Sequence, residues 1–275
     1  MPDGTGRLAT WPAWLMGCLL AATSFSAAAE CGPQSVSWEL AQVVQRSDWR
    51  ELDPAERTLV HESGSLSGPE LAFVWRCNNW GLGAQLSELA GSRRYDGQTS
   101  TGVPVSSRTA LSQRQAQFQA DLWLSDAWQV AGRLTQLSLW RDIASARGAT
   151  GYPERFDWHL FSAGVVWHTA PGPSQFKVGA WVAMPLASSL TLQLPGRDPA
   201  SLPLGDLRQF ELQLGWRVQL SPGWHAQLDA GYRRTDIAMG ASQVITRNGV
   251  PVGVAHQPQT RLINRPIAVG VNYAY

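Results

Sequence analysis

Lysine and charge are scarce in this sequence of 275 residues. Charged residues make up 16% of the chain, whereas about a quarter is usual in soluble domains. Lys177 is the one lysine among the 22 basic residues, and the net charge is +1. This charge excludes a nucleic-acid binder that relies on a basic surface, and 44% hydrophobic residues exclude a disordered chain.

Long apolar runs and cofactor motifs are also missing. After residue 29 no run approaches the roughly 18 apolar residues that a membrane-spanning helix needs. The sequence contains no GxxxxGK loop and no dinucleotide-binding glycine pattern. Its 5 histidines are scattered without metal-ligand spacing. We therefore expect neither a cofactor nor a metal.

Residues 1–29 are predicted to be a secretory signal peptide. An apolar run over residues 14–22 is followed by Ser26-Ala27-Ala28-Ala29, small residues that suit signal peptidase. Cys18 ends a stretch that resembles a lipobox, so a lipoprotein is the alternative. Cleavage after the alanines leaves residues 30–275 as one exported domain.

Alternation of apolar and polar residues, which is typical of β-strands, dominates the exported chain. In Phe210–Leu220 every even position is apolar and every odd position is polar or glycine. Similar patterns predict strands at 70–76, 80–91, 116–122, 128–140, 158–168, 176–192, 224–233 and 266–275. Residues 34–60 fit either a first strand or an amphipathic helix. A strand there raises the total to an even ten, as is usual for bacterial barrels.

The connections between these strands alternate in length. Short connections fall at 78–79, 125–127, 170–175 and 221–223, and long polar ones at about 92–112, 142–156, 195–208 and 239–265. Short turns on one side and long extracellular loops on the other predict a transmembrane antiparallel up-and-down β-barrel of ten strands, with eight as the alternative. Asn248-Gly249 predicts a type I′ hairpin within the last loop.

Two cysteines, Cys31 and Cys77, remain after export. An even number of cysteines in an oxidising compartment favours a disulfide, and two free thiols are the alternative. With an even number of strands, Cys31 precedes the first strand and Cys77 ends the second at the same rim. We therefore predict a bridge between them.

Five of the 14 tryptophans lie beside the short turns. They are Trp75, Trp80, Trp128, Trp167 and Trp224. Tryptophan gathers at membrane interfaces, where the ring is in apolar surroundings and the N–H stays hydrated. We interpret the five as an interface girdle, and the alternative is the core of a secreted soluble β-sandwich.

The chain ends in alternating apolar residues and stops on an aromatic one. The apolar positions are Ile267, Val269, Val271, Tyr273 and Tyr275. This pattern resembles the terminal strand of outer-membrane barrels, which the barrel-assembly machinery recognises. The resemblance implies that the protein resides in the outer membrane of a Gram-negative cell.

With apolar faces turned outward, the lumen receives long polar side chains of both charges. The predicted network contains Asp121, Arg133, Glu211, Arg217, His225, Asp229 and Arg233. Barrels of eight strands are just filled by side chains, so a ten-stranded barrel with this lining is expected to be nearly plugged. A narrow solute channel is the alternative.

Asp157 and His159 form the first candidate catalytic pair. Asp157-Trp158-His159 resembles half of the site of omptin proteases, ten-stranded barrels in which an Asp-x-His pair faces two aspartates. That resemblance implies that His159 activates a water molecule and Asp157 orients the histidine. The second aspartate pair is missing, and counting back from Phe161 places both residues on the lipid-facing side.

His61 and Ser63 form the second candidate pair. Outer-membrane phospholipases and lipid A deacylases carry a similar His-x-Ser pair on a lipid-facing strand. The resemblance implies that His61 acts as base and Ser63 attacks an ester. Those families have Asn after the Ser, whereas Gly64 follows here, and the sequence names no third residue that would orient His61.

We expect a non-enzymatic integral surface protein that acts in envelope structure or surface binding through its loops. An outer-membrane hydrolase, either a lipid acyl hydrolase or an omptin-like protease, is the alternative. The expected partners are outer-membrane lipid, including the phosphates of lipopolysaccharide, and the barrel-assembly machinery. Arginines predicted to meet those phosphates from the loops are Arg93, Arg94, Arg141, Arg147, Arg155 and Arg197.

Overall fold

The structure is a computed structural model that describes residues 34–98, 102–146 and 149–275. The predicted signal peptide, 1–29, and Cys31 lie outside the described residues, so the signal peptide and the disulfide stay predictions. Cys77 is buried where the second strand ends. The described residues include no helix that is both long and apolar enough to cross a membrane.

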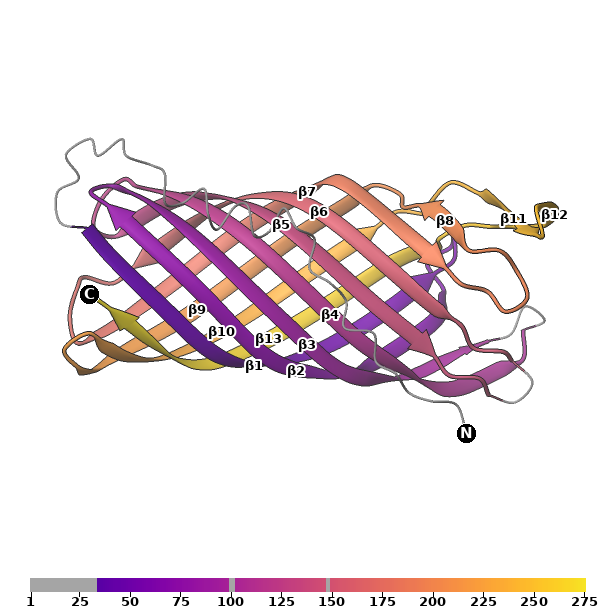
Figure 1. The fold of residues 1–275 in the computed structure, drawn as a ribbon, viewed down its shortest axis with the longest axis horizontal. Coiled ribbons are helices and arrows are strands. Elements are labelled where there is room, and N and C mark those ends of the chain that lie inside the picture. The colour runs from indigo at the N-terminus through magenta and orange to yellow at the C-terminus, as the bar shows by residue number, and fades with distance from the viewer. Residues whose placement is uncertain (1–33, 99–101, 147–148) are drawn as a thin grey trace.

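Ten antiparallel strands form one closed barrel (Figure 1). They are β1 (Gln34–Leu52), β2 (Thr58–Cys77), β3 (Trp80–Gln98), β4 (Pro104–Trp123), β5 (Trp128–Ile143), β6 (Pro153–His168), β7 (Ser174–Leu192), β9 (Leu207–Ser221), β10 (Trp224–Ile237) and β13 (Gln259–Ala274). Each strand pairs with its neighbours in chain order, and β13 pairs with β1 to close the barrel. This confirms the predicted ten-stranded fold.

Strand β1 resolves the ambiguity of residues 34–60. Its side chains alternate between the two faces from Leu40 to Arg50, with Ala41 and Val43 buried inside while Leu40 and Val44 are 57% and 50% exposed outside. The whole strand is paired on both edges, with β2 on one side and β13 on the other. A helix would leave both neighbouring edges unpaired, so barrel closure selects the strand.

The two ends of the barrel differ as the sequence predicts. One end, the short-turn rim, has turns at 78–79, 124–127, 169–173 and 222–223. The other end, the long-loop rim, carries the longer connections together with the short strand β8 (Ala200–Pro203) and a separate hairpin of β11 (Gln243–Arg247) and β12 (Val250–Ala255). Strand β1 begins and strand β13 ends at the short-turn rim (Figure 1).

Two predicted loops are shorter than expected. The loop predicted at 92–112 is reduced to the few residues between Gln98 and Pro104, and β13 begins at Gln259 inside the loop predicted at 239–265. The residues in question are polar, which made them resemble loops. In the barrel these residues point alternately into a polar lumen and onto a charged outer face. Their polarity is therefore typical of the part of the barrel wall next to the long-loop rim.

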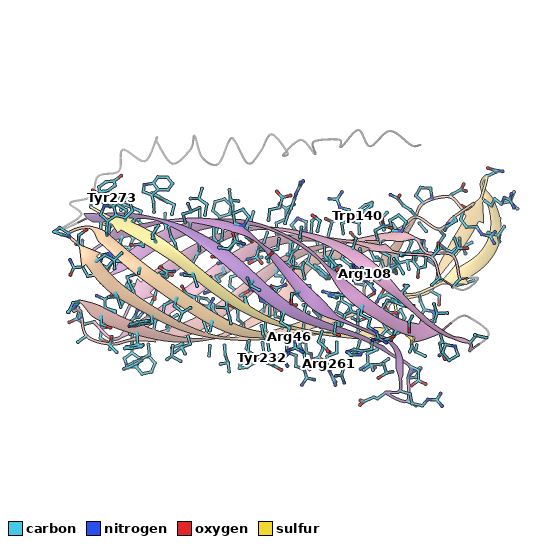
Figure 2. The ribbon with its side chains drawn as sticks, turned by 90° about the horizontal axis from the view of Figure 1, so that it is seen from below. Arg46, Arg108, Trp140, Tyr232, Arg261 and Tyr273 are labelled. Atoms are coloured by element: carbon cyan, nitrogen blue, oxygen red, sulfur yellow. The ribbon has the colours of Figure 1, made fainter. Side chains whose placement is uncertain are left out.

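The outer wall carries a broad apolar band above the short-turn rim. Trp80, Trp128, Trp167 and Trp224 are 38%, 49%, 37% and 47% exposed on it, and Trp75 packs edge-on against Trp80 at 4.8 Å between ring centroids. The predicted C-terminal positions also face outward, between 37% exposed at Tyr273 and 69% at Tyr275. Figure 2 places Tyr273 at one end of the barrel and Arg46, Tyr232 and Arg261 farther along it.

The β11–β12 hairpin, here called the ribbon, projects from the long-loop rim. Asn248 and Gly249 have φ of 52° and 76°, which confirms the predicted Asn-Gly turn with two left-handed residues. Asp198 anchors the ribbon because its carboxylate accepts hydrogen bonds from Gly249 N (2.9 Å), Asn248 N (3.1 Å) and Thr246 Oγ1 (2.7 Å). These donors, Gly249 first, hold the pKa of the Asp198 carboxyl below its ordinary value.

Asp198→Ala is expected to free the ribbon, seen as faster protease cleavage near residues 247–250 at pH 7. Because the folded-state pKa of Asp198 is depressed, its stabilisation is complete above the ordinary value of about 3.9 and disappears as pH falls through the folded-state pKa. The wild-type ribbon should therefore become protease-sensitive only in strong acid. Asp206→Ala is the control, and equal cleavage of the two variants at pH 7 would exclude the anchor.

Candidate functional site

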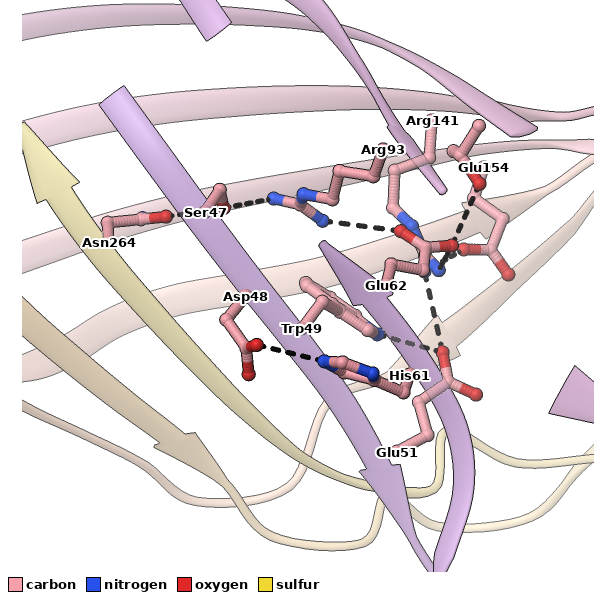
Figure 3. A network of polar contacts seen from close by, with 11 residues as sticks. Ser47, Asp48, Trp49, Glu51, His61, Glu62, Arg93, Arg141, Glu154 and Asn264 are labelled. Atoms are coloured by element: carbon pink, nitrogen blue, oxygen red, sulfur yellow. Dashed lines mark hydrogen bonds and ion pairs between the residues drawn. The ribbon is translucent and has the colours of Figure 1, made fainter. Parts of the chain in front are cut away.

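The upper lumen, near the long-loop rim, is filled by a buried ion cluster (Figure 3). Glu62 on β2 accepts hydrogen bonds from Arg141 (2.8 Å), Arg93 (3.4 Å) and Thr109 (2.9 Å). Arg141 also pairs with Glu154 (2.5 Å), and its guanidinium lies 4.3 Å from the ring centroid of Trp49. Alternation brings these side chains inward from six strands, where the carboxylates compensate the buried arginines.

A second ion cluster crosses the middle of the lumen. Glu211 on β9 binds Arg133 at 3.1 Å and Arg233 at 2.7 Å. Arg133 also donates to Gln119 and Gln213 and lies over the ring of Trp181, with 3.1 Å to its centroid. The cluster therefore ties opposite walls of the barrel together.

The remaining predicted lumen residues lie closer to the short-turn rim. Asp229 pairs with Lys177 at 2.8 Å. Asp121 accepts from Gln119 at 2.6 Å, and Arg217 donates to Gln227 at 3.5 Å. Arg217 thus meets the amide of a neighbouring glutamine.

The lumen leaves little free space between these groups. Two cavities touch the central cluster, with volumes of about 90 Å³ and 10 Å³. Such volumes hold a few water molecules and no larger solute. Around the central cluster, the described side chains therefore fill most of the lumen.

A histidine–carboxylate pair lies on the outer wall of the barrel near the long-loop rim. His61 Nε2 is 2.9 Å from Asp48 Oδ2, across the β1–β2 hairpin (Figure 3). Arg50 donates to the other oxygen of Asp48 at 3.1 Å. Asp48 is therefore an orienting partner for His61. The sequence did not reveal it because the register of β1 with β2 cannot be read from the sequence.

Ser63 lies on the same outer wall, beside this pair. It is directly opposite Asp48 on β1 and Arg94 on β3, while His61 is opposite Arg50 and Asp96. Positions two apart on one strand share a face, so His61 and Ser63 project in the same direction. Strand β2 is continuous through Gly64, Gly68 and Pro69.

Asp157 and His159 also face outward, as counting along the strand predicts. Their neighbours Phe156 and Trp158 are buried, at 0% and 2% exposed. Asp157 accepts a hydrogen bond from Ser138 and pairs with Arg155 at 2.9 Å. Among the described residues no hydrogen bond joins it to His159, so the geometry does not support the omptin-like dyad.

Arginines form facing pairs on the outer wall where the apolar band ends. On β1 the outward residues change from Leu40 and Val44 to Arg46 and Arg50. On β13 they change from Ile267 to Arg265 and Arg261. The register places Arg46 opposite Arg265 and Arg50 opposite Arg261.

These pairs differ in how their charges are compensated. Arg261 is paired with Asp236 at 2.9 Å and Arg50 with Asp48 at 3.1 Å. In the described part of the chain neither Arg46 nor Arg265 has a carboxylate partner, and Arg265 lies 5.9 Å from the ring centroid of Tyr232. The sequence could not reveal the pairs because β1 and β13 lie at opposite ends of the chain.

The loop arginines singled out in the sequence do not form one group. Arg93 and Arg141 are 1% exposed and point into the lumen, so their predicted role in lipid contact is wrong. Arg94 and Arg155 face outward but pair with Asp96 and Asp157. Arg147 lies outside the described residues. The arginines that do reach the membrane-facing wall are mainly on strands.

The similarity found to a solved structure supports the barrel fold and nothing beyond it. No protein-family model matches the chain, and no curated protein matches its sequence. Among solved structures, the outer-membrane protease OmpT of Escherichia coli is similar with a TM-score of 0.57 and 9% identity, over 88% of this chain and 96% of that chain. The translocator domain of the autotransporter NalP from Neisseria meningitidis has a TM-score of 0.46 at 14% identity, over 95% of each chain.

The similarity at this identity concerns the fold alone. Together with the exposed apolar band and the rim of tryptophans, the closed ten-stranded barrel defines an outer-membrane β-barrel protein.

Proposed function

We propose that this protein is a surface-binding component of the outer membrane, with a plugged lumen, that holds phosphate groups of outer-leaflet lipid on its arginine pairs. The observation that carries the proposal is the facing of Arg46 and Arg265 on the outer wall. Like charges directly opposite each other on a sheet are destabilising, so an anion between them would relieve the repulsion.

The position of the pairs supports a lipid headgroup as that anion. Arg46 and Arg265 directly follow the exposed Val44 and Ile267 on the outer wall, at the end of the apolar band, where a barrel wall passes from acyl chains to headgroups. Arginine presents a planar fork of donors that suits phosphate, and Tyr232 beside Arg265 is an amphipathic side chain typical of this level.

The ribbon supports surface binding through the loops as well. Val244, Val250, Val252 and Val254 are between 41% and 67% exposed on it. Apolar groups exposed on a projecting element favour contact with another molecule. The ribbon is separate from the barrel sheet, so it can serve as a contact surface without a cost to barrel closure.

The test of the lipid site is lipopolysaccharide binding by the purified barrel in a neutral detergent. R46Q/R265Q is expected to weaken binding about ten-fold or more, because charged hydrogen bonds to phosphate contribute about 1.5–3 kcal/mol each. Dephosphorylated lipopolysaccharide should bind the wild-type protein and R46Q/R265Q equally.

The matched control is R57Q/R76Q, which removes one arginine from the turn between β1 and β2 and one beside the short turn at 78–79. The double control should keep wild-type affinity for both lipids. If R46Q/R265Q and the control bound phosphorylated lipopolysaccharide as the wild type does, the arginine pairs would have no role in lipid binding.

A further inference from the structure

We infer that one acyl chain of lipopolysaccharide binds in a groove on the membrane-facing wall, across strands β4 to β7. The groove has a volume of about 790 Å³, within the range of about 300–1,000 Å³ that is typical of ligand sites. Asp121 is the one charged residue among the described residues that line it. The inference rests on the proposed function for the kind of lipid, and it adds where a chain of that lipid lies.

Small residues on three neighbouring strands form the floor of the groove. The register aligns Ala120 on β4, Gly132 on β5 and Ala163 on β6 in one outward row across the sheet. Rows of larger outward side chains flank this floor, with Phe118, Leu134 and Phe161 on the long-loop side and Leu122, Val130 and Val165 on the short-turn side. The missing side chains therefore leave a trough between two apolar ridges.

Trp181 closes the groove on the side of the lumen. Its side chain is 2% exposed, and its ring packs against Gly164 from inside the barrel. The guanidinium of Arg133 lies over the same ring, 3.1 Å from its centroid. A ligand therefore enters the groove from the membrane, where the surrounding medium is hydrocarbon.

The groove runs obliquely from the headgroup level into the apolar band. Beyond the floor, the same row of paired residues continues through Val182 on β7 and Phe210 on β9 to Arg234 on β10. At its other end the row reaches Leu82, two residues after Trp80 of the girdle. Because barrel strands are tilted, such a row descends across the wall. It follows the path of an acyl chain that hangs from a headgroup.

Two arginines stand at the upper end of the groove. Arg208 lies two residues from Phe210 on the same outward face of β9, and Arg234 is directly opposite Phe210. Asp236 is opposite Arg208 but pairs with Arg234 at 2.7 Å. Among the described residues Arg208 makes no ion pair, so its guanidinium can meet a phosphate oxygen.

The leaflet favours lipopolysaccharide as the occupant. In outer-membrane barrels the rim with the long loops is extracellular, so the arginine end of the groove lies in the outer leaflet. Lipopolysaccharide is the main lipid of that leaflet, and it carries both phosphate groups and acyl chains. It therefore matches the charged upper end of the groove and the apolar floor below.

The experiment compares two ligands of the purified barrel in a neutral detergent: intact lipopolysaccharide, and lipopolysaccharide from which all acyl chains have been removed. G132L/A163L fills the floor of the groove. A Cβ atom at position 132 would lie 3.6 Å from the ring of Phe161, an ordinary contact, so the fold tolerates a side chain there. This variant should bind intact lipopolysaccharide about ten-fold more weakly than the wild type and bind the deacylated form equally well.

Two further variants separate the groove from packing changes and from the phosphate sites. A84L/A226L enlarges outward alanines on β3 and β10 that do not line the groove, and it should bind both ligands as the wild type does. R46Q/R265Q should weaken binding of both ligands, because both carry the phosphates. Unboiled gel mobility shows that each barrel is folded.

The groove and the arginine pairs can fail separately. Weaker binding of intact lipopolysaccharide by G132L/A163L, with wild-type binding by R46Q/R265Q, would support the groove and overturn the arginine pairs. Equal affinity of the wild type and G132L/A163L for intact lipopolysaccharide would overturn the groove, and so would equal affinity of the wild type for the two ligands. A phospholipid that stays bound to the wild type in the presence of lipopolysaccharide, but not to G132L/A163L, would overturn lipopolysaccharide as the occupant.

Discussion

Glu62→Ala is expected to destabilise the barrel by about 3–5 kcal/mol, because removal of one partner leaves buried charges uncompensated. The Glu62 side chain is 0% exposed and those of Arg93 and Arg141 are each 1% exposed, so water cannot replace the lost carboxylate. Thr109 loses its acceptor as well. The temperature at which unboiled protein changes to the unfolded gel mobility measures the effect.

The control for Glu62→Ala is Arg57→Ala, which breaks an ion pair in the turn between β1 and β2. The Arg57 side chain is 81% exposed, and exposed pairs contribute little. The control should therefore unfold at nearly the wild-type temperature. Equal unfolding temperatures for the two variants would mean that the upper lumen cluster does not hold the barrel together.

Deletion of residues 266–275 is expected to abolish the closed barrel. These residues include the C-terminal half of β13. That half pairs with β1 on one edge and with β10 on the other. Without them, both neighbouring edges would present unpaired N–H and C=O groups to lipid, at several kcal/mol for each group. We expect no heat-modifiable band and no protein in the outer-membrane fraction.

The matched control deletes a segment of similar length, the ribbon at 243–255, and joins its ends with glycine and serine. The ribbon forms a sheet of its own, so its loss removes no barrel pairing. This variant should reach the outer membrane and keep the mobility shift. A folded barrel without residues 266–275 would contradict both the closure and the predicted assembly signal.

The alternation of residues predicted most of the fold. It identified nine strands, placed the short turns and assigned most side chains to the correct face, because side-chain direction in a strand depends only on local geometry. Even the outward direction of Asp157 and His159 followed from counting along one strand. For residues 34–60, the parity of the strand count decided what the local pattern left open.

Errors arose where polarity was taken as a sign of a loop. Arg93 and Arg141 were assigned to lipid contact from loops, yet they are buried in the lumen against Glu62. A polar residue near a barrel rim can belong to a loop, the lumen or the headgroup level. These three environments share one composition, so local sequence cannot separate them.

Local patterns along the chain are enough to predict an outer-membrane barrel of ten strands, its two unlike rims and its polar lumen, because alternation and turn chemistry depend on neighbouring residues. Which side chains contact each other follows from the pairing of strands in the folded barrel. The register of β1 with β2 brings Asp48 into hydrogen-bond contact with His61. Closure of the barrel between β1 and β13 places Arg46 opposite Arg265. Register and closure depend on pairing between distant strands, and a shift of one residue would turn each of these side chains to the opposite face.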